Sequence, residues 1–290
     1  MTTKILTHKK PYTCFIIGLV GFCLFINIAY ASFSFFYAKY YIDRQLRLGA
    51  VSDLAVKTAK AKEAKKNEPV YINLPGAGQI RAIVDDYSLP NSVWGLVSKT
   101  HSISNDYIPM SLKIPVVATR TDKSSDERSV RQEIETQLIA MFSAASTAGY
   151  KLMIGSGYRS ADLQATYFNS LARSVGEYIA NQSIARPGQS EHQTGLAIDI
   201  STVTMQCYLD DCFANTGDGL WLADNSYKFG FILRYPKNKE SITGYRYEPW
   251  HFRYVGVDLA TALYESGLVF DEAWSYLEKA DLKLKANGAI

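Results

Sequence analysis

The chain has 290 residues, of which 47% are hydrophobic and 20% are charged. This length suits one ordinary domain with additions or two small domains, and so high an apolar content excludes a largely disordered chain. Lysine and arginine total 31 against 28 aspartates and glutamates, giving a net charge of +3. This near balance, without any run of arginines, excludes the basic surface typical of nucleic-acid-binding proteins. Four cysteines exclude a miniprotein built on disulfides.

The first predicted element is an apolar N-terminal segment. Residues 11–38 contain no Asp, Glu, Lys or Arg, and about 20 apolar residues suffice for a helix to cross a hydrocarbon layer of about 30 Å. We expect a transmembrane anchor there, with residues 1–10 in the cytoplasm, because lysines precede it. The sequence Ala29-Tyr30-Ala31 also fits a signal-peptidase site, so cleavage after Ala31 stays open. Either way, we expect the remainder to be exported to the outside of the cell membrane, attached by a single pass if uncleaved.

A change of composition follows the apolar segment. Residues 39–69 are rich in alanine, lysine and other helix formers, without a proline before Pro69. This pattern predicts a helical or partly disordered stalk. From Val70 the chain has the mixed texture of a folded domain, so we assign residues 70–290 to that domain.

Several short elements are predicted within this domain. Apolar residues three and four apart predict helices, over residues 129–149, 162–175, 257–266 and 271–279. Ser160 is placed to cap the second of these. Strands are predicted over residues 151–154, 195–200 and 247–255. Without a βαβ rhythm, this order predicts an α+β domain with a small antiparallel sheet flanked by helices.

Histidine is scarce, and two of the four histidines have dense polar surroundings. A catalytic zinc takes three ligands from histidine and carboxylate, with a glutamate nearby to accept a proton from water. His192, Asp199 and His251 would supply the ligands. Glu248 would be the base, since residues three apart lie within about 10 Å even in an extended chain. The spacing alone is weakly diagnostic.

Three ordered motifs make the pattern specific. They read Ser156-Gly157-Tyr158-Arg159-Ser160-x-x-x-Gln164, Ser190-x-His192-x-x-Gly195-x-Ala197-x-Asp199 and Glu248-x-Trp250-His251. Together they resemble the signature of the VanY-type D-alanyl-D-alanine metallocarboxypeptidases, in the superfamily that includes lysostaphin-like peptidases and the sonic hedgehog signalling domain. The similarity runs from about residue 89 to residue 256. The resemblance implies that the small sheet carries a zinc site.

The resemblance also implies roles for individual residues. Zn²⁺ would be held by His192, Asp199 and His251. Glu248 would be the general base and proton shuttle, and Arg159 would stabilise the oxyanion of the tetrahedral carbonyl. Ser190, Gln164 and Arg159 would hold the peptide. The implied activity is hydrolysis of the C-terminal D-Ala from peptidoglycan stem peptides, with no obligate protein partner inferred.

Two cysteines lie between the metal-binding motifs. Cys207 and Cys212 are five residues apart. In an exported domain they would close a small disulfide loop beside the cleft, with free buried thiols as the alternative.

Three other functions compete with this prediction. A serine carboxypeptidase is disfavoured because no lysine has a serine three residues before it and Lys-Thr-Gly is absent. A non-catalytic, zinc-bearing cell-wall-binding domain would not need Glu248 and Arg159. An L,D-carboxypeptidase acting on tetrapeptide stems stays open, because bond specificity depends on pocket walls that the motifs do not identify.

Overall fold

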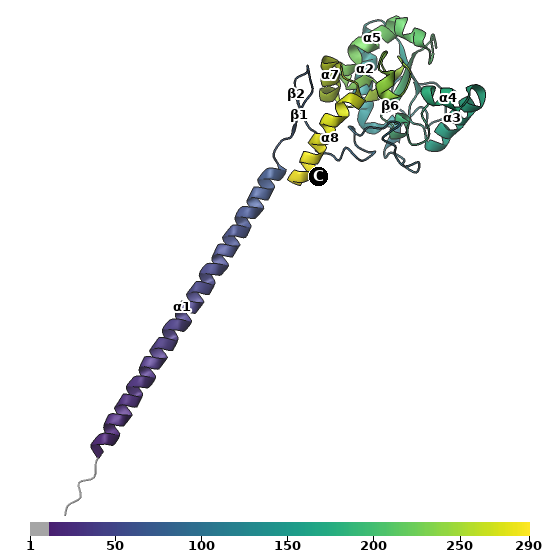
Figure 1. Ribbon diagram of the computed structural model, residues 1–290. Coiled ribbons are helices and arrows are strands. Elements are labelled where there is room, and N and C mark those ends of the chain that lie inside the picture. The colour runs from purple at the N-terminus through teal and green to yellow at the C-terminus, as the bar shows by residue number, and fades with distance from the viewer. Residues whose placement is uncertain (1–11) are drawn as a thin grey trace, which may run out of the picture. The chain divides into compact units, whose positions relative to one another are not determined.

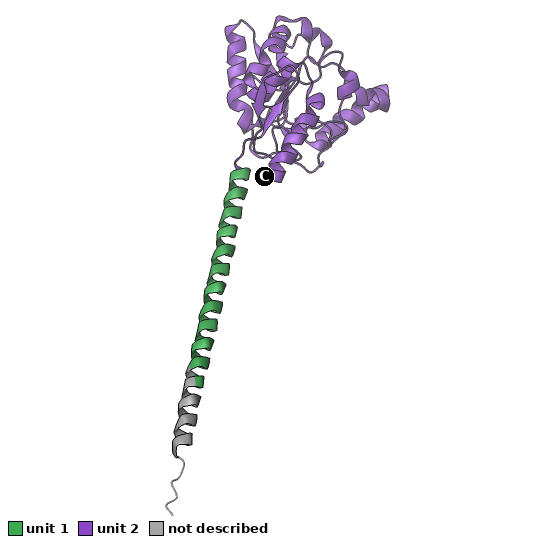
Figure 2. Ribbon diagram, turned by 60° about the vertical axis from the view of Figure 1, so that its left-hand side comes forward, with its two compact units in different colours: residues 1–65 green, residues 66–290 purple. Residues whose placement is uncertain are grey.

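The computed structural model describes residues 12–290, and within its first helix the side chains of residues 12–24 and 27 are outside the description. The chain divides into two compact units, Met1–Lys65 and Lys66–Ile290, which Figure 2 colours separately. Each is considered by itself. The predicted cytoplasmic segment, residues 1–10, lies outside the described residues.

The described part of the first unit is helical, and its helix α1 (Tyr12–Lys66) is 55 residues long and ends at the first residue of the second unit (Figure 1). No proline interrupts it, so the predicted stalk is helical as far as Lys66. Among the described residues, no helix is both long enough and apolar enough to cross a membrane. The predicted transmembrane helix is therefore not supported here, although its residues 11–24 fall outside the described side chains.

The second unit is built on a four-stranded antiparallel sheet with the strand order β5-β6-β8-β7. Its strands are β5 (Leu152–Ser156), β6 (Ala197–Thr202), β7 (Phe231–Leu233) and β8 (His251–Tyr254). Asp199 lies directly opposite His251 on the neighbouring strand, and on its other side it pairs with Ser156. The sheet register therefore brings two predicted ligands together across 52 residues of sequence.

One face of this sheet packs into the core. Side chains alternate between the two faces of a strand, and Ile198, Ile200 and Phe252 are buried in one apolar cluster. Helix α2 (Glu135–Thr147) supplies buried side chains to the same cluster, at the three- and four-residue spacing of one helical face. Full burial of each such side chain contributes about 1.5–3 kcal/mol. The opposite face is left for Asp199 and His251.

Further helices surround the sheet. Helix α3 (Ala161–Val175) begins as predicted at Ser160, whose Oγ accepts a hydrogen bond of 3.2 Å from the Leu163 backbone. The other α-helices are α4 (Glu177–Ser183), α5 (Gly217–Asn225), α6 (Glu240–Thr243), α7 (Val257–Ser266) and α8 (Phe270–Asn287). The 3₁₀ helices are η1 (Gln132–Ile134), η2 (Glu191–Thr194), η3 (Asp211–Asn215) and η4 (Ser226–Phe229). The α+β prediction is confirmed.

Two small antiparallel pairs complete the unit. The first joins β1 (Tyr71–Asn73) to β2 (Gln79–Arg81), and the second joins β3 (Leu112–Lys113) to β4 (Val130–Arg131). Buried residues of the first pair share a second apolar cluster with α7 and α8. These strands have only two or three residues, too few for a repeating sequence pattern to reveal them.

Three predicted element boundaries are wrong by more than two residues, while the others differ from the structure by two residues or fewer. The helix predicted from residue 129 starts at Glu135, because Arg131 is held in a strand and donates a backbone hydrogen bond of 3.0 Å to Gly195. The strand predicted from residue 247 starts at His251, whose backbone N–H closes a turn onto the Glu248 carbonyl at 3.1 Å. The last helix continues to Asn287 rather than ending at residue 279.

Candidate metal centre and active site

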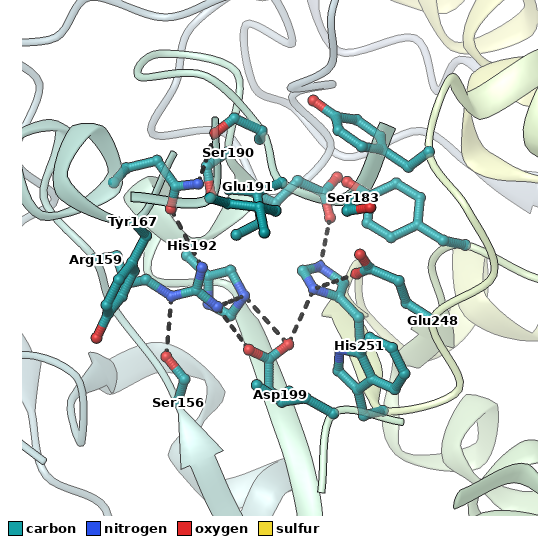
Figure 3. A pocket seen from close by; sticks show the side chains of 18 of the residues that line it. Ser156, Arg159, Tyr167, Ser183, Ser190, Glu191, His192, Asp199, Glu248 and His251 are labelled. Carbon is teal, nitrogen blue, oxygen red and sulfur yellow. Dashed lines mark hydrogen bonds and ion pairs between the residues drawn. The ribbon is translucent and has the colours of Figure 1, made fainter. Parts of the chain in front are cut away.

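Three predicted ligands form one buried group. Asp199 comes from β6, His251 from β8, and His192 from η2 just before β6 (Figure 3). Their ligand atoms all lie within 4.8 Å of one another. Asp199 Oδ1 is 3.3 Å from His192 Nε2 and 3.2 Å from His251 Nδ1. The sheet register and the η2 turn thus place two nitrogens around one carboxylate oxygen.

The donor set fits a zinc ion. Zinc bonds of about 2.0–2.1 Å in tetrahedral geometry put neighbouring donor atoms roughly 3.4 Å apart. The distances from Asp199 Oδ1 to the two nitrogens agree with this spacing. Asp199 Oδ1 is buried and makes no hydrogen bond, and a bound cation would satisfy it. Two imidazoles with one carboxylate are also a ligand set that zinc takes in catalytic sites.

The ring of His192 is oriented by a backbone carbonyl. Its Nδ1 lies 2.6 Å from the Gly157 oxygen, an acceptor, so Nδ1 carries the hydrogen and Nε2 faces Asp199. Burial, assisted by the positive charge of Arg159, lowers the pKa of His192 to about 4. The imidazole is therefore neutral at pH 7, the form that binds metal ions.

His251 is oriented by a glutamate that the motifs did not single out. Its Nε2 lies 3.5 Å from Oε2 of Glu191, so Nδ1 faces Asp199. Burial alone would lower the pKa of His251, but the neighbouring carboxylates of Asp199 and Glu191 raise it to about 9. A metal ion must therefore displace a proton from this ring below that pH.

Glu191 is itself fixed by two buried arginines. Its Oε1 accepts hydrogen bonds from Arg234 Nε at 2.8 Å and Arg253 Nη1 at 3.1 Å. Burial opposes ionisation, but the two guanidinium groups hold the pKa of Glu191 well below its usual range. Arg234 and Arg253 lie in apolar stretches of sequence around β7 and β8. This was a sequence signal for a buried acidic residue, because a buried charge requires a partner of opposite charge.

Glu248 lies in the turn that precedes β8, beside the predicted ligands. Its Oε2 is 3.7 Å from His251 Nδ1, and its backbone N–H donates to the Tyr235 carbonyl at 3.0 Å. Burial raises the pKa of Glu248 to about 7. A carboxyl group with that pKa can accept and return a proton near neutral pH.

Arg159 contacts the ligand group directly. Its Nη2 donates to Asp199 Oδ2 at 2.6 Å and lies 2.7 Å from His192 Nε2. Its Nε donates to Ser156 Oγ at 3.0 Å. Because one lone pair cannot serve two partners, a cation bound to His192 Nε2 requires this guanidinium to move away from that nitrogen.

The two other predicted substrate contacts differ in their surroundings. Gln164 is buried and uses both ends of its amide within the protein, accepting from Arg159 Nη1 at 3.2 Å and donating to the Ala185 carbonyl at 2.7 Å. This arrangement favours a role in positioning Arg159. Ser190 is also buried and lines the pocket.

The predicted site residues open onto one pocket of about 690 Å³. Aromatic side chains form much of its wall, and the sequence motifs identified none of them as pocket residues. They are Tyr167, Tyr208, Tyr235, Tyr245 and Trp250. A pocket of this size with an apolar lining and a few convergent polar groups is typical of small-molecule and peptide sites.

The predicted disulfide is present. Cys207 and Cys212 are bonded, with their Cα atoms 5.5 Å apart, so the alternative of free thiols is wrong. Two residues enclosed by this bond, Tyr208 and Leu209, line the same pocket as the ligand group. The disulfide therefore belongs to the site rather than to a remote surface.

Comparisons with known proteins show which family this chain resembles. Residues 127–257 match the family model described as VanY: D-alanyl-D-alanine carboxypeptidase. The chain is 43% identical over 190 residues to the protein YodJ of Bacillus subtilis strain 168, an alignment that covers 66% of this chain and 70% of YodJ.

Two solved structures extend the comparison. A structure of the LdcB LD-carboxypeptidase has 43% sequence identity and a TM-score of 0.61, covering 64% of this chain and 87% of that chain. A mutant of the vancomycin resistance D,D-pentapeptidase VanY, in complex with Zn(II), has 33% identity and a TM-score of 0.52, covering 63% of this chain and 98% of that chain. The chain therefore belongs to the VanY D-alanyl-D-alanine carboxypeptidase family.

Proposed function

We propose that this protein is a zinc-dependent D-alanyl-D-alanine carboxypeptidase that removes the C-terminal D-Ala from peptidoglycan stem peptides. The observation that carries the proposal is the buried group of His192, Asp199 and His251, whose ligand atoms lie within 4.8 Å of one another. Glu248 lies in the same pocket. A non-catalytic binding domain would have no need for a buried carboxyl whose pKa is raised to about 7.

The side chains around this group would have different roles in the hydrolysis. His192, Asp199 and His251 would hold zinc, which would act as a Lewis acid and lower the pKa of bound water from about 15.7 towards 7. Glu248 accepts the proton of the attacking water and delivers it to the leaving amine of D-Ala. Arg159, already beside the ligands, places its guanidinium where the carbonyl oxygen becomes negative.

The same side chains position the peptide. Arg159 and Ser190 line the pocket. We assign them to bind the backbone and the terminal carboxylate of the peptide. Gln164 holds the Arg159 guanidinium through the bond of 3.2 Å to Nη1. Gln164 therefore contributes to substrate binding through Arg159.

One alternative is favoured by a specific observation. The LdcB LD-carboxypeptidase is 43% identical to this chain, against 33% for the D,D-pentapeptidase VanY. Cleavage of the L,D bond in tetrapeptide stems is therefore the second candidate. The ligand group and Glu248 would serve either bond, since both reactions hydrolyse a peptide next to a terminal D-residue.

In this proposal, the N-terminal part of the chain attaches the enzyme to the membrane. Residues 11–38, without charged side chains, would anchor the chain by a single pass. Residues 39–69 would be the stalk and residues 70–290 the catalytic domain outside the membrane. The Cys207–Cys212 disulfide supports an oxidising location for that domain.

The test uses the full-length protein and two defined substrates. The purified chain, loaded with zinc, is incubated separately with a pentapeptide and a tetrapeptide stem, and the products are identified by mass. Release of one D-Ala from the pentapeptide supports D,D-cleavage, whereas shortening of the tetrapeptide alone supports the alternative. Glu248→Gln and a chelator should each abolish the release. Full activity in either condition would overturn the mechanism.

A further inference from the structure

The loop between β6 and η3 has an unusual backbone. Met205, Cys207 and Leu209 have φ angles of 62°, 54° and 51°, in the left-handed region that residues other than glycine seldom adopt. Such conformations cost about 1–3 kcal/mol each and persist only where surrounding structure holds them. Two of these residues belong to the segment that the Cys207–Cys212 disulfide closes. The bond therefore secures a conformation that the local sequence does not favour.

Tyr208, the aromatic residue in this loop, packs tightly against neighbouring residues. A Cβ atom on Gly155 would lie 2.6 Å from Cε2 of Tyr208, so the ring rests directly on the β5 backbone. The Arg120 guanidinium lies 4.8 Å from the centroid of the same ring, in the geometry of a cation–π contact. Tyr208 is thus held between Gly155 and Arg120.

The loop directs apolar surface towards the reacting groups. Tyr208 and Leu209 line the pocket together with Asp199 and Glu248. Leu209 leaves 38% of its surface exposed, which is available to an occupant of that pocket. Gly155, under the Tyr208 ring, immediately precedes Ser156, the residue that accepts a hydrogen bond from Arg159 Nε. The loop is therefore adjacent to the residues assigned to chemistry without belonging to them.

We propose that the disulfide-closed loop of residues 207–212 is a wall of the substrate pocket, and that Tyr208 and Leu209 contact the bound peptide and determine its affinity. This inference rests on the proposed peptidase function and adds the surface that recognises the peptide. The wall offers a ring and a branched alkyl group with no formal charge, which suits the small apolar side chains of alanine residues. Opening the disulfide releases the left-handed backbone and disorders the wall.

The consequence is redox-dependent substrate affinity. Reduction by dithiothreitol breaks the S–S bond, transfers two electrons and two protons to give two thiols, and oxidises dithiothreitol to its cyclic disulfide. The metal ligands lie outside the loop. We therefore expect KM to rise while kcat and the zinc content are maintained.

The experiment compares steady-state kinetics of full-length variants on the stem peptide that the wild type cleaves. Tyr208→Ala and the double variant Cys207→Ser/Cys212→Ser should each raise KM about tenfold, equivalent to about 1.4 kcal/mol of binding. Their kcat should stay within about twofold of the wild type, because the wall binds the substrate and the transition state equally well. Leu220→Ala, an exposed apolar residue of α5 outside the pocket lining, is the control and should leave KM unchanged.

Dithiothreitol should raise the KM of the wild type and leave that of the double serine variant unchanged. This pairing separates reduction of the loop from removal of zinc by the thiol, which would inactivate both proteins. If Tyr208→Ala and the double variant are active and have the KM of the wild type, the proposed role of the loop as a wall of the substrate pocket is wrong. A loss of kcat and zinc at constant KM would also overturn it. Failure of the wild type to cleave any stem peptide would instead overturn the proposed function.

Discussion

Oε2 of Glu191 faces Nε2 of His251 across 3.5 Å in the protein interior, and neither atom has a hydrogen-bond partner within 3.5 Å at suitable geometry. A hydrogen on Nε2 that points at this carboxylate leaves the Nδ1 lone pair free to face Asp199. The other carboxylate oxygen is held by Arg234 and Arg253. Glu191 therefore selects the tautomer of His251, a candidate metal ligand.

Glu191→Gln should weaken zinc binding. Loss of such a carboxylate partner lowers metal affinity about 10–100-fold, measurable by competition with a chromophoric chelator. Asp271→Asn is the matched control, because Asp271 pairs with Arg234 but does not contact His251. We expect the control to retain wild-type zinc affinity once folding has been checked by circular dichroism. Equal zinc affinities for Glu191→Gln and the wild type would contradict the orienting role.

The pH dependence of catalysis should follow the ionisation of the Glu248 carboxyl group. Burial raises the pKa of Glu248 to about 7, and the group must be ionised to accept a proton. A bound cation favours the charged carboxylate, so the midpoint in the zinc-loaded enzyme should lie at or below pH 7. Below it, kcat/KM should fall about tenfold for each pH unit. The measurement is a kcat/KM profile at saturating zinc, and a rate that rises on acidification from pH 7 would contradict the assignment.

Part of this site could be predicted because its signals are local. Ser160 precedes a helix with regular apolar spacing, and it caps that helix in the structure. The three candidate ligands lie in two compact motifs, and the alternation of a strand suffices to turn Asp199 away from Ile198 and Ile200. The family resemblance supplied the pairing of those two motifs, which the spacing alone did not.

The remainder depends on contacts between distant residues. Glu191 meets Arg234 and Arg253 over 43 and 62 positions of sequence, so nothing beside Glu191 identifies its partners. The helix start at Glu135 was mispredicted for the same reason, since Arg131 is bound to Gly195 rather than to its own neighbours. Local propensity is overridden wherever such tertiary contacts are stronger.

Stability towards acid should depend on Glu127. Burial opposes ionisation of this carboxylate, but Lys123 and Tyr167, at 2.7 and 2.6 Å, lower its pKa to about 2 from an ordinary value of 4.5. The stabilisation is therefore complete above pH 4.5 and is lost as the pH falls towards 2. Glu127→Gln should reduce the free energy of unfolding at pH 6 more than at pH 3, measured by urea denaturation. A difference between the two proteins that is independent of pH would contradict this linkage.

Gly157→Ala should damage both the fold and the metal centre. A Cβ at position 157 would lie 2.3 Å from the backbone oxygen of Ser129, which cannot move as a flexible side chain could. The carbonyl of Gly157 also orients His192. We expect about 1–3 kcal/mol less free energy of unfolding, as for other overpacked sites, together with weaker zinc binding. Gly78→Ala is the control, because nothing lies within 4 Å of its added Cβ. Wild-type zinc affinity in Gly157→Ala would mean that His192 keeps its orientation even when the added Cβ displaces this carbonyl.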